Sequence, residues 1–339
     1  MKRVGHDFSR FKKDLIELME VQPGSDMDYI YSEMLFNVGL LRDEKFDLGE
    51  LRLLNTAFKE LRYALKVFKP YRDVPKAAVF GSARTPTDHE HFKLAAQFGK
   101  QLAKKGWMVI TGGASGIMEA AMVGAGAKNS FGLNIMLPFE QDANPVIKNN
   151  PKLIFFKYFF TRKLMFLKES QATVLFPGGF GTFDEGFESL TLTQTGKAKP
   201  RPIVLLDMPG SRYWKDLLRY IKVHLGKERL ISPNDLSLIR HFQDVDKAVY
   251  ELKHFYSNYE SSRFLKDHYL LRFRKPLSPK QFTKLNTDFK DLLSRGDFEL
   301  LAGVEEDDNK DPKLQRLKFH FDRSGYARLR QLIDYLNSL

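Results

Sequence analysis

One nine-residue stretch constrains the fold of this chain more than any other, because it joins an apolar strand to a helix through a glycine-rich turn. Residues 172–176 are typical of a buried parallel strand, residues 177–185 read PGGFGTFDE, and apolar residues at helical spacing follow. Three glycines in four positions let the backbone approach an anion without side-chain clashes. A helix N-terminus presents free N–H groups to that anion. The stretch therefore predicts a site for a phosphorylated ligand.

Further glycine turns follow earlier apolar strands. Residues 81–84 (GSAR) come after the strand predicted at residues 77–80, and residues 111–119 (TGGASGIME) come after residues 107–110. From residue 77 on, short apolar strands alternate with helical segments, which predicts an α/β fold with a doubly wound parallel sheet. Ligands of such sheets bind at the carboxyl ends of the strands. The glycine turns all lie at that edge.

The pattern P-G-G-x-G-T-x-x-E resembles the signature of the LOG ("lonely guy") family of cytokinin-activating phosphoribohydrolases, once mislabelled lysine decarboxylases. Arg162-Lys163 before the motif and Lys199-Pro200 after it agree with the order found in that family. The resemblance covers roughly residues 75–250 and not the two ends, so the chain resembles the longer bacterial members. It implies a Rossmann-like domain that acts as an N-glycosidase similar to AMP nucleosidase, hydrolysing a nucleoside 5′-monophosphate to free base and ribose 5-phosphate.

The resemblance assigns catalysis to Glu185, the last residue of the motif, and to Arg162. The residues alone leave a second explanation for Glu185, because Thr182 and Glu185 have the spacing of a capping box at a helix start. A positive charge near a helix N-terminus is disfavoured by the helix dipole. We therefore expect Arg162 to have an anionic partner, either Glu185 or the substrate phosphate.

The remaining candidate residues would bind the substrate. Backbone N–H groups and one hydroxyl are expected to hold the phosphate, from Gly178, Gly179, Gly181, Thr182, Gly112 and Gly113. Other substrate contacts are expected from Ser82, Arg84, Glu119 and Lys163. Simpler explanations stay open: a tight turn with Thr182 as the N-cap, turn chemistry at Ser82 and Arg84, and a helix-dipole role for Glu119. The aromatic run at residues 155–160 is more typical of a core than of a base-stacking surface.

Composition narrows the class of partner. The chain has 339 residues, a net charge of +12 and no cysteine. The positive excess lies mostly in residues 76–260, which suits a phosphorylated small molecule, and no arginine-rich stripe with interleaved aromatics predicts a nucleic-acid partner. No apolar run approaches the roughly 18 residues of a membrane span. The lack of disulfides suits a reducing compartment, so we expect a cytoplasmic protein.

We expect neither a cofactor nor a metal. No lysine lies in a context recognisable for a Schiff base with pyridoxal phosphate. The run Asp88-His89-Glu90-His91 contains metal-ligand residue types, but His89 and His91 would point to different faces of a helix. The expected ligand is therefore the nucleotide substrate alone.

Three parts are expected along the chain: a helical N-terminal extension at residues 1–74, the Rossmann-like catalytic domain at 75–260, and a small α+β C-terminal unit at 266–339. Helical spacing of apolar residues recurs at residues 8–19 and 51–68. The tail is expected to contain an acidic loop at 305–310. Its predicted elements are a strand (268–273), a helix (279–293), two strands (298–301 and 317–321) and a helix (326–336).

The resemblance also implies a homodimer, or a higher homo-oligomer, built on the helices of the sheet domain. Two other functions stay open on the same fold. One is a non-catalytic nucleotide sensor or carrier, and the other is a DNA-processing protein with a related core, which would need a basic groove.

Overall fold

The computed structural model describes residues 22–136, 143–301, 303 and 311–339. The chain divides into two compact units, Met1–Glu60 and Leu61–Leu339. Within the described ranges, no helix combines the length and the apolar character that a membrane crossing requires. The helical pattern expected at residues 8–19 and the acidic loop expected at residues 305–310 lie outside the described residues.

The first unit is helical. It contains α2 (Asp26–Asp43) and the first part of α3 (Leu48–Phe68), which continues into the second unit. Ser25 caps α2, since its side-chain oxygen accepts a hydrogen bond from the N–H of Asp28 at 3.2 Å. The helix predicted over residues 51–68 is confirmed.

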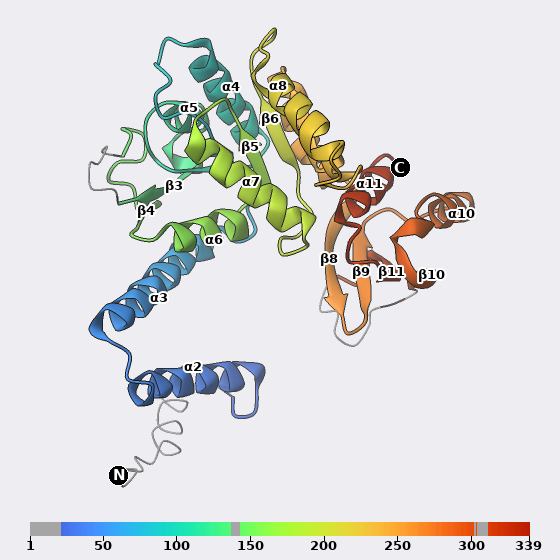
Figure 1. Ribbon diagram of the computed structural model, residues 1–339, viewed down its shortest axis with the longest axis horizontal. Helices are drawn as coiled ribbons and strands as arrows, with labels where there is room; N and C mark the ends of the chain where they lie inside the picture. Colours follow the sequence, from blue (N-terminus) through green and yellow to red (C-terminus); the bar gives the residue numbers. More distant parts are fainter. Residues whose placement is uncertain (1–21, 137–142, 302, 304–310) are drawn as a thin grey trace. The chain divides into compact units, whose positions relative to one another are not determined.

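A seven-stranded parallel sheet forms the centre of the second unit (Figure 1). Its spatial order is β4-β3-β2-β1-β5-β6-β7, so the chain builds outward from β1 in one direction and then, from β5, in the other. This confirms the doubly wound α/β fold predicted from the sequence. The order reverses between β1 and β5, and such switch points are where open α/β sheets bind ligands. The strands are β1 (Lys76–Phe80), β2 (Met108–Thr111), β3 (Ser130–Ile135), β4 (Leu153–Phe156), β5 (Ala172–Leu175), β6 (Ile203–Leu206) and β7 (Ile239–Phe242).

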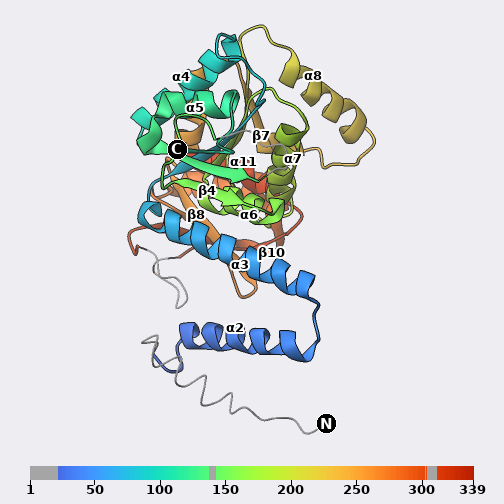
Figure 2. The same ribbon diagram turned by 90° about the vertical axis from the view of Figure 1, so that its left-hand side faces the viewer.

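Helices cover both faces of this sheet. Alternate strand residues such as Ala77 and Val79 pack against α4, α5 and α9, whereas Ala78 and Phe80 pack on the opposite side with α6, α7, α8 and the end of α3. Figure 2 shows α4 and α5 side by side. A Cβ at Gly124 of α5 would meet the Ala96 backbone oxygen of α4 at only 1.8 Å, so this close approach requires glycine. The helices are α4 (Glu90–Lys104), α5 (Ile117–Ala125), α6 (Phe159–Glu169), α7 (Phe180–Gln194), α8 (Tyr213–Tyr220) and α9 (Val245–Phe255).

A second, antiparallel sheet of order β10-β11-β9-β8 follows in the tail and packs against α10 and α11. The strand predicted at 268–273 is confirmed, as are the strand and helix near the C-terminus, whereas the helix predicted at 279–293 ends at Asp288. One strand, β8, was not predicted. The elements are β8 (Tyr259–Leu265), β9 (His268–Phe273), α10 (Pro279–Asp288), β10 (Leu293–Leu301), β11 (Gln315–Phe321) and α11 (Tyr326–Asn337).

The three-part division of the chain stays a prediction, but two observations bear on its last boundary. Residue 266 lies in the turn between β8 and β9, which pair with each other as antiparallel strands. Asn337 at the end of α11 accepts hydrogen bonds from the backbone N–H groups of Asn258 and Tyr259, at 3.1 and 2.8 Å. The tail and the parallel sheet lie in one compact unit.

Candidate active site

A cleft of about 620 Å³ opens where the strand order reverses, beyond the carboxyl ends of β1 and β5. The turn after β1, the turn after β2, the start of α7 and one side of α6 form its walls. The cleft brings together eight of the residues singled out in the sequence: Ser82, Arg84, Gly112, Arg162, Gly179, Gly181, Thr182 and Glu185.

The start of α7 gives the cleft its anion-binding character. Gly179 is the N-cap of the helix, and Gly181 lies in its first turn. Apart from the adjoining backbone of the turn and helix, no atom of the described residues lies within 4 Å of where a Cβ would stand on either glycine. Gly179, Phe180 and Gly181 line the cleft at the positive end of the helix dipole, where the first N–H groups of a helix have no partner inside the helix. This geometry suits a phosphate group.

The capping box expected from Thr182 and Glu185 is not formed. The helix begins at Phe180, so its N-cap is Gly179, three residues before the position predicted. The N–H of Thr182 donates to the Gly179 backbone oxygen at 3.0 Å. Both the Thr182 N-cap and the Glu185 capping role are therefore wrong, because the backbone turns into the helix already at the glycines. Glu185 lies on the second turn of α7, beyond the first N–H groups, which are the ones that lack a partner inside a helix.

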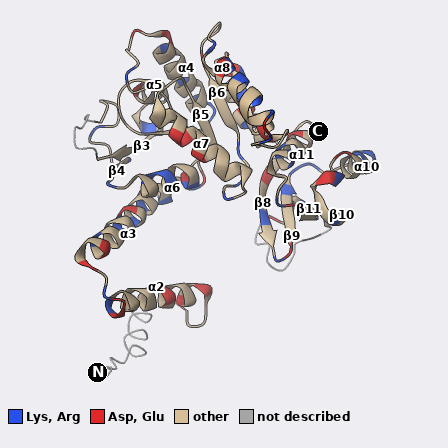
Figure 3. Ribbon diagram, in the orientation of Figure 1, with Lys and Arg blue, Asp and Glu red and all other residues tan. Residues whose placement is uncertain are grey.

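Glu185 instead pairs with Arg162. Nη2 of Arg162 on α6 donates to Glu185 Oε1 at 3.1 Å, so Glu185 is the partner of this arginine among the two anions that the sequence left open. Both side chains are shielded, with exposed fractions of 13% for Arg162 and 6% for Glu185. The guanidinium also lies over the Phe159 ring, 5.0 Å from its centroid. Figure 3 shows that α6 carries basic residues and α7 carries acidic ones.

Burial and neighbouring charge act on Glu185 in opposite directions. Burial raises the pKa of its carboxyl above the ordinary glutamate value, although Arg162 and Lys163 both favour the ionised form. A buried, partly desolvated carboxylate with a fixed cation beside it is what acid–base and electrostatic catalysis use.

Lys163 lies on the far side of this pair and does not line the cleft. Its Nζ is 2.6 Å from Glu188, 2.9 Å from Asp184 and 3.9 Å from Glu185. Burial works to lower the pKa of Lys163, but the hydrogen bonds to Glu188 and Asp184 outweigh it, and the pKa is raised. Lys163 thus forms ion pairs with three carboxylates. Its expected contact with substrate stays a prediction.

The turn after β2 is fixed against the turn after β1. Gly116 has a φ of +67°, and a Cβ there would stand 2.3 Å from the Ser82 backbone oxygen. Two asparagines that the sequence analysis missed hold the same turn. Asn134 Nδ2 donates to the Gly112 oxygen at 3.3 Å, and Asn144 Nδ2 donates to the Gly113 oxygen at 3.0 Å.

Three other predicted residues lie outside the cleft wall. Gly113 faces Leu153 and Ile147, and Glu119 lies on the first turn of α5. Gly178 turns its backbone polar groups toward Tyr213. Their expected roles with substrate stay predictions.

Apolar side chains complete the cleft, and no sequence motif marked them. Phe80, Met118, Phe166 and Phe180 line it, and Phe180 is 93% exposed. The aromatic run at residues 155–160, expected in the core, is mostly at the surface: Phe156 is buried, whereas Phe155, Phe159 and Phe160 are exposed. The expectation was wrong because β4 ends and α6 begins within the run, which turns these rings outward.

The histidine pair that resembled a metal cluster serves a different purpose. His89 is the N-cap of α4, and its Nδ1 accepts a hydrogen bond from the N–H of His91 at 3.0 Å. Within the described part of the chain, no three His, Asp or Glu residues are arranged to hold a metal ion.

Known proteins resemble this chain over the region of the parallel sheet. Residues 117–252 fit the family model described as "Possible lysine decarboxylase". A cytokinin riboside 5′-monophosphate phosphoribohydrolase of Mycobacterium tuberculosis is 31% identical over 140 residues, which cover 39% of this chain and 73% of that protein. One of the same name from Rhodococcoides fascians is 26% identical over 181 residues, covering 52% of this chain and 89% of that protein.

Among solved structures, the molybdenum cofactor carrier protein of Chlamydomonas reinhardtii is 24% identical. The match covers 53% of this chain and 96% of that one, with a TM-score of 0.37. A structure titled TM1055 is 21% identical over 53% of this chain and 98% of that one, also with a TM-score of 0.37. At these values the likeness carries no argument about function.

Proposed function

The chain belongs to the LOG family, and we propose that it is a nucleoside 5′-monophosphate phosphoribohydrolase that releases a free base and ribose 5-phosphate. One observation supports this proposal above all others. A buried carboxylate, Glu185, is held by Arg162 in the wall of a cleft, on the same helix as the open, glycine-lined start of α7. The cleft thus combines an anion site with a fixed negative charge that a bare phosphate site would avoid.

In the proposed reaction, the oxygen of a water molecule bonds to C1′ while the bond from C1′ to the base nitrogen breaks, and one proton of that water ends on the base. The transition state resembles an oxocarbenium ion. The Glu185 carboxylate stabilises its positive charge and orients the water, as carboxylates do in glycoside hydrolysis. Arg162 fixes the carboxylate in place and favours its ionised form.

The phosphate supplies binding energy away from the reacting bond. We propose that the N–H groups at Gly179 and Gly181, together with the Thr182 hydroxyl, bind it and so position C1′ near Glu185, which is one helical turn further along α7. Arg84 is exposed at the cleft and adds a second positive charge within reach of an anionic ligand.

The test is release of free base from a panel of nucleoside 5′-monophosphates, with the matching unphosphorylated nucleosides as controls. We expect release from at least one monophosphate, and efficiency lower by orders of magnitude on its nucleoside, because charge-assisted hydrogen bonds to phosphate contribute roughly 1.5–3 kcal/mol each. Equal rates on nucleotide and nucleoside would contradict the phosphate role of the glycines. Tight nucleotide binding without release from any monophosphate would favour a sensor or carrier.

We further propose that the protein is a homodimer that uses helices of the sheet domain. Large apolar side chains of β4, α6 and α7 are exposed: Phe155, Phe159, Phe160, Leu164 and Phe187. Exposed apolar surface of this kind is typical of interfaces. Light scattering should give twice the chain mass, and Phe160→Asp with Leu164→Asp should lower it to one chain. Tyr250→Asp, at an exposed position on α9, is the matched control.

A further inference from the structure

Gly178 is the one glycine of the P-G-G-x-G-T stretch whose polar groups are already occupied by a side chain. The Tyr213 hydroxyl donates a hydrogen bond to the Gly178 carbonyl oxygen at 2.5 Å. The Gly178 N–H points back at the same hydroxyl, 3.4 Å away. One hydroxyl from α8, distant in sequence, therefore contacts both polar groups of this residue.

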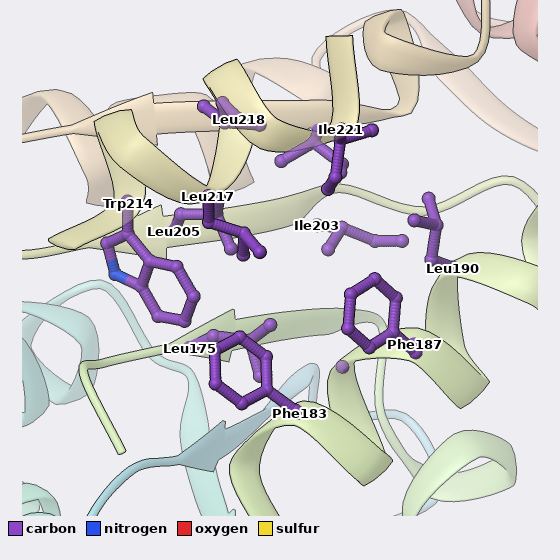
Figure 4. Close-up of a pocket in the computed structure, with 12 residues that line it drawn as sticks. Leu175, Phe183, Phe187, Leu190, Ile203, Leu205, Trp214, Leu217, Leu218 and Ile221 are labelled. Carbon is purple, nitrogen blue, oxygen red and sulfur yellow. The ribbon is translucent and has the colours of Figure 1, made fainter. Parts of the chain in front are cut away.

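Packing fixes the Tyr213 ring in this position. The ring is half-buried, lies parallel to Phe183 of α7 with 6.1 Å between centroids, and meets Trp214 edge-on at 4.7 Å. Beyond it, α8 packs on α7 through an apolar layer that contains Phe183, Trp214 and Leu217 (Figure 4). The cavity left in this layer is about 20 Å³, little more than the space of one water, so it is packing and not a ligand site.

Hydrogen bonds also hold the segment that leads into α8. Gln243 Nε2 donates to the Ser211 backbone oxygen at 2.8 Å and to Asp207 Oδ1 at 3.1 Å. Asp207 is fully buried at the end of β6, so this amide ties the segment to the sheet. Tyr213 is therefore anchored independently of the glycine turn that it contacts.

The glycine turn is held from its other sides by the backbone and by Thr182. The Ser82 N–H donates to the Pro177 oxygen at 3.1 Å. A Cβ on Gly178 would stand 2.1 Å from Thr182 Oγ1 and 2.8 Å from the Ser82 nitrogen. The base of the turn is thus fixed on all these sides, whereas Gly179 and Gly181 beyond it face open space.

We infer that Tyr213 is a positioning residue for the phosphate site: its hydroxyl fixes the Gly178 peptide and thereby preorganises the N–H groups of Gly179 and Gly181. The inference rests on the proposed function, since it takes those N–H groups to bind the substrate phosphate. Preorganised donors bind more tightly because ligand binding does not have to order them. Burial raises the pKa of Tyr213, although its hydrogen bond with the Gly178 backbone acts the other way, so the hydroxyl keeps its proton at neutral pH.

Tyr213→Phe tests the inference, because it removes the hydroxyl and keeps the ring that stacks on Phe183. Ribose 5-phosphate is the binding probe, measured by titration calorimetry, since it carries the phosphate and no base. We expect its affinity to fall about tenfold, the size of one lost hydrogen bond. With AMP, or whichever monophosphate the enzyme prefers, KM should rise by a similar factor while kcat at saturation stays within about twofold of wild type.

Tyr220→Phe is the matched control, because Tyr220 is an exposed tyrosine at the other end of α8 whose ring lies against His224. It should leave KM, kcat and the affinity for ribose 5-phosphate unchanged. If Tyr213→Phe binds ribose 5-phosphate as wild type does, the inference is overturned. A lower melting temperature with kcat and KM affected alike would also overturn it, since that is the signature of a purely structural residue.

Failure of the proposed function gives a different result. If the wild-type protein releases no base, yet Tyr213→Phe binds ribose 5-phosphate about tenfold more weakly, the positioning role stands and the catalytic proposal falls. If the wild-type protein is active and the variant is unchanged in KM and affinity, the catalytic proposal stands and the positioning role falls.

Discussion

Replacing Glu185 by glutamine distinguishes a catalytic role of this residue from a structural one, because the two roles predict different changes in kcat and in the free energy of unfolding. Glutamine keeps the shape and an oxygen that can accept from Arg162, but removes the charge. At an effective dielectric constant of about 20, a charge pair about 4 Å apart contributes roughly 4 kcal/mol, against about 1 kcal/mol in water. Glu185 is 6% exposed, so the larger value applies to a positive charge developing nearby.

Loss of most of that energy from the transition state corresponds to a fall in kcat of about 10²- to 10³-fold, as found when other electrostatic catalytic groups are removed. Stability should change much less. The ion pair with Arg162 is weakened, but the burial that raises the pKa of Glu185 shows that its charge is itself unfavourable there, and glutamine removes that penalty. The two effects oppose each other, and we expect a net change within about 1 kcal/mol.

The assay is steady-state release of base by Glu185→Gln, together with thermal melts and calorimetric titration with nucleotide. Glu188→Gln is the matched control: the same substitution on the same helix, at a carboxylate that pairs with Lys163 but does not line the cleft. It should keep its rate within a fewfold of wild type. A folded Glu185→Gln protein that retains wild-type kcat would refute the mechanism.

Three further predictions follow from the same geometry. Arg162→Ala should abolish activity, and Arg162→Lys should restore it only partly, because lysine cannot replace the planar guanidinium between Glu185 and the Phe159 ring. Lys168→Ala, on the same helix, should remain active, and activity assays of the three variants test this prediction. The acidic limb of kcat/KM against pH should lie above the ordinary glutamate range, since burial raises the pKa of Glu185 and the carboxylate must be ionised. Activity is therefore lost earlier as pH falls, and the residual activity of Glu185→Gln should lack this limb. Removal of residues 266–339 should give insoluble protein, because it leaves β8 without β9 and removes the Asn337 side chain that accepts from the backbone of Tyr259; a soluble, active truncation would show that the tail is a separate unit.

The sheet and the position of the cleft could be predicted because their signals are local. Each glycine turn follows its own apolar strand, and the rule for parallel sheets brings the carboxyl ends of the strands to one edge. An anionic partner for Arg162 was also expected, since an arginine near a helix start needs an anion, and Glu185 was one of the two candidates. The start of α7 could not be predicted, because a turn with three glycines can enter a helix at several positions. In the structure the helix begins at Phe180.

Other features depend on contacts between distant residues and carry no local signal. Tyr213 lies 35 residues after Gly178, in a helix that resembles any other amphipathic segment. Asn134 follows the strand pattern of β3, and only its hydrogen bond to Gly112 identifies its role. Strand β8 reads YESSRFL, with polar residues on both faces, so the period-two pattern that identifies half-buried strands is weak there.

The burial of Glu185 also favours the proposed hydrolase over a protein that only carries a nucleotide. A carrier needs the glycine turn and a cleft, and it gains affinity for an anionic ligand from positive charge alone. A carboxylate in the wall opposes that binding, and burying it is unfavourable, as the direction of its pKa shift shows. The chain nevertheless supplies Arg162 to hold this carboxylate ionised at the cleft. We expect such an arrangement to lower affinity for the ground state and to stabilise a positive charge that exists only in the transition state, which is the property expected of a catalyst.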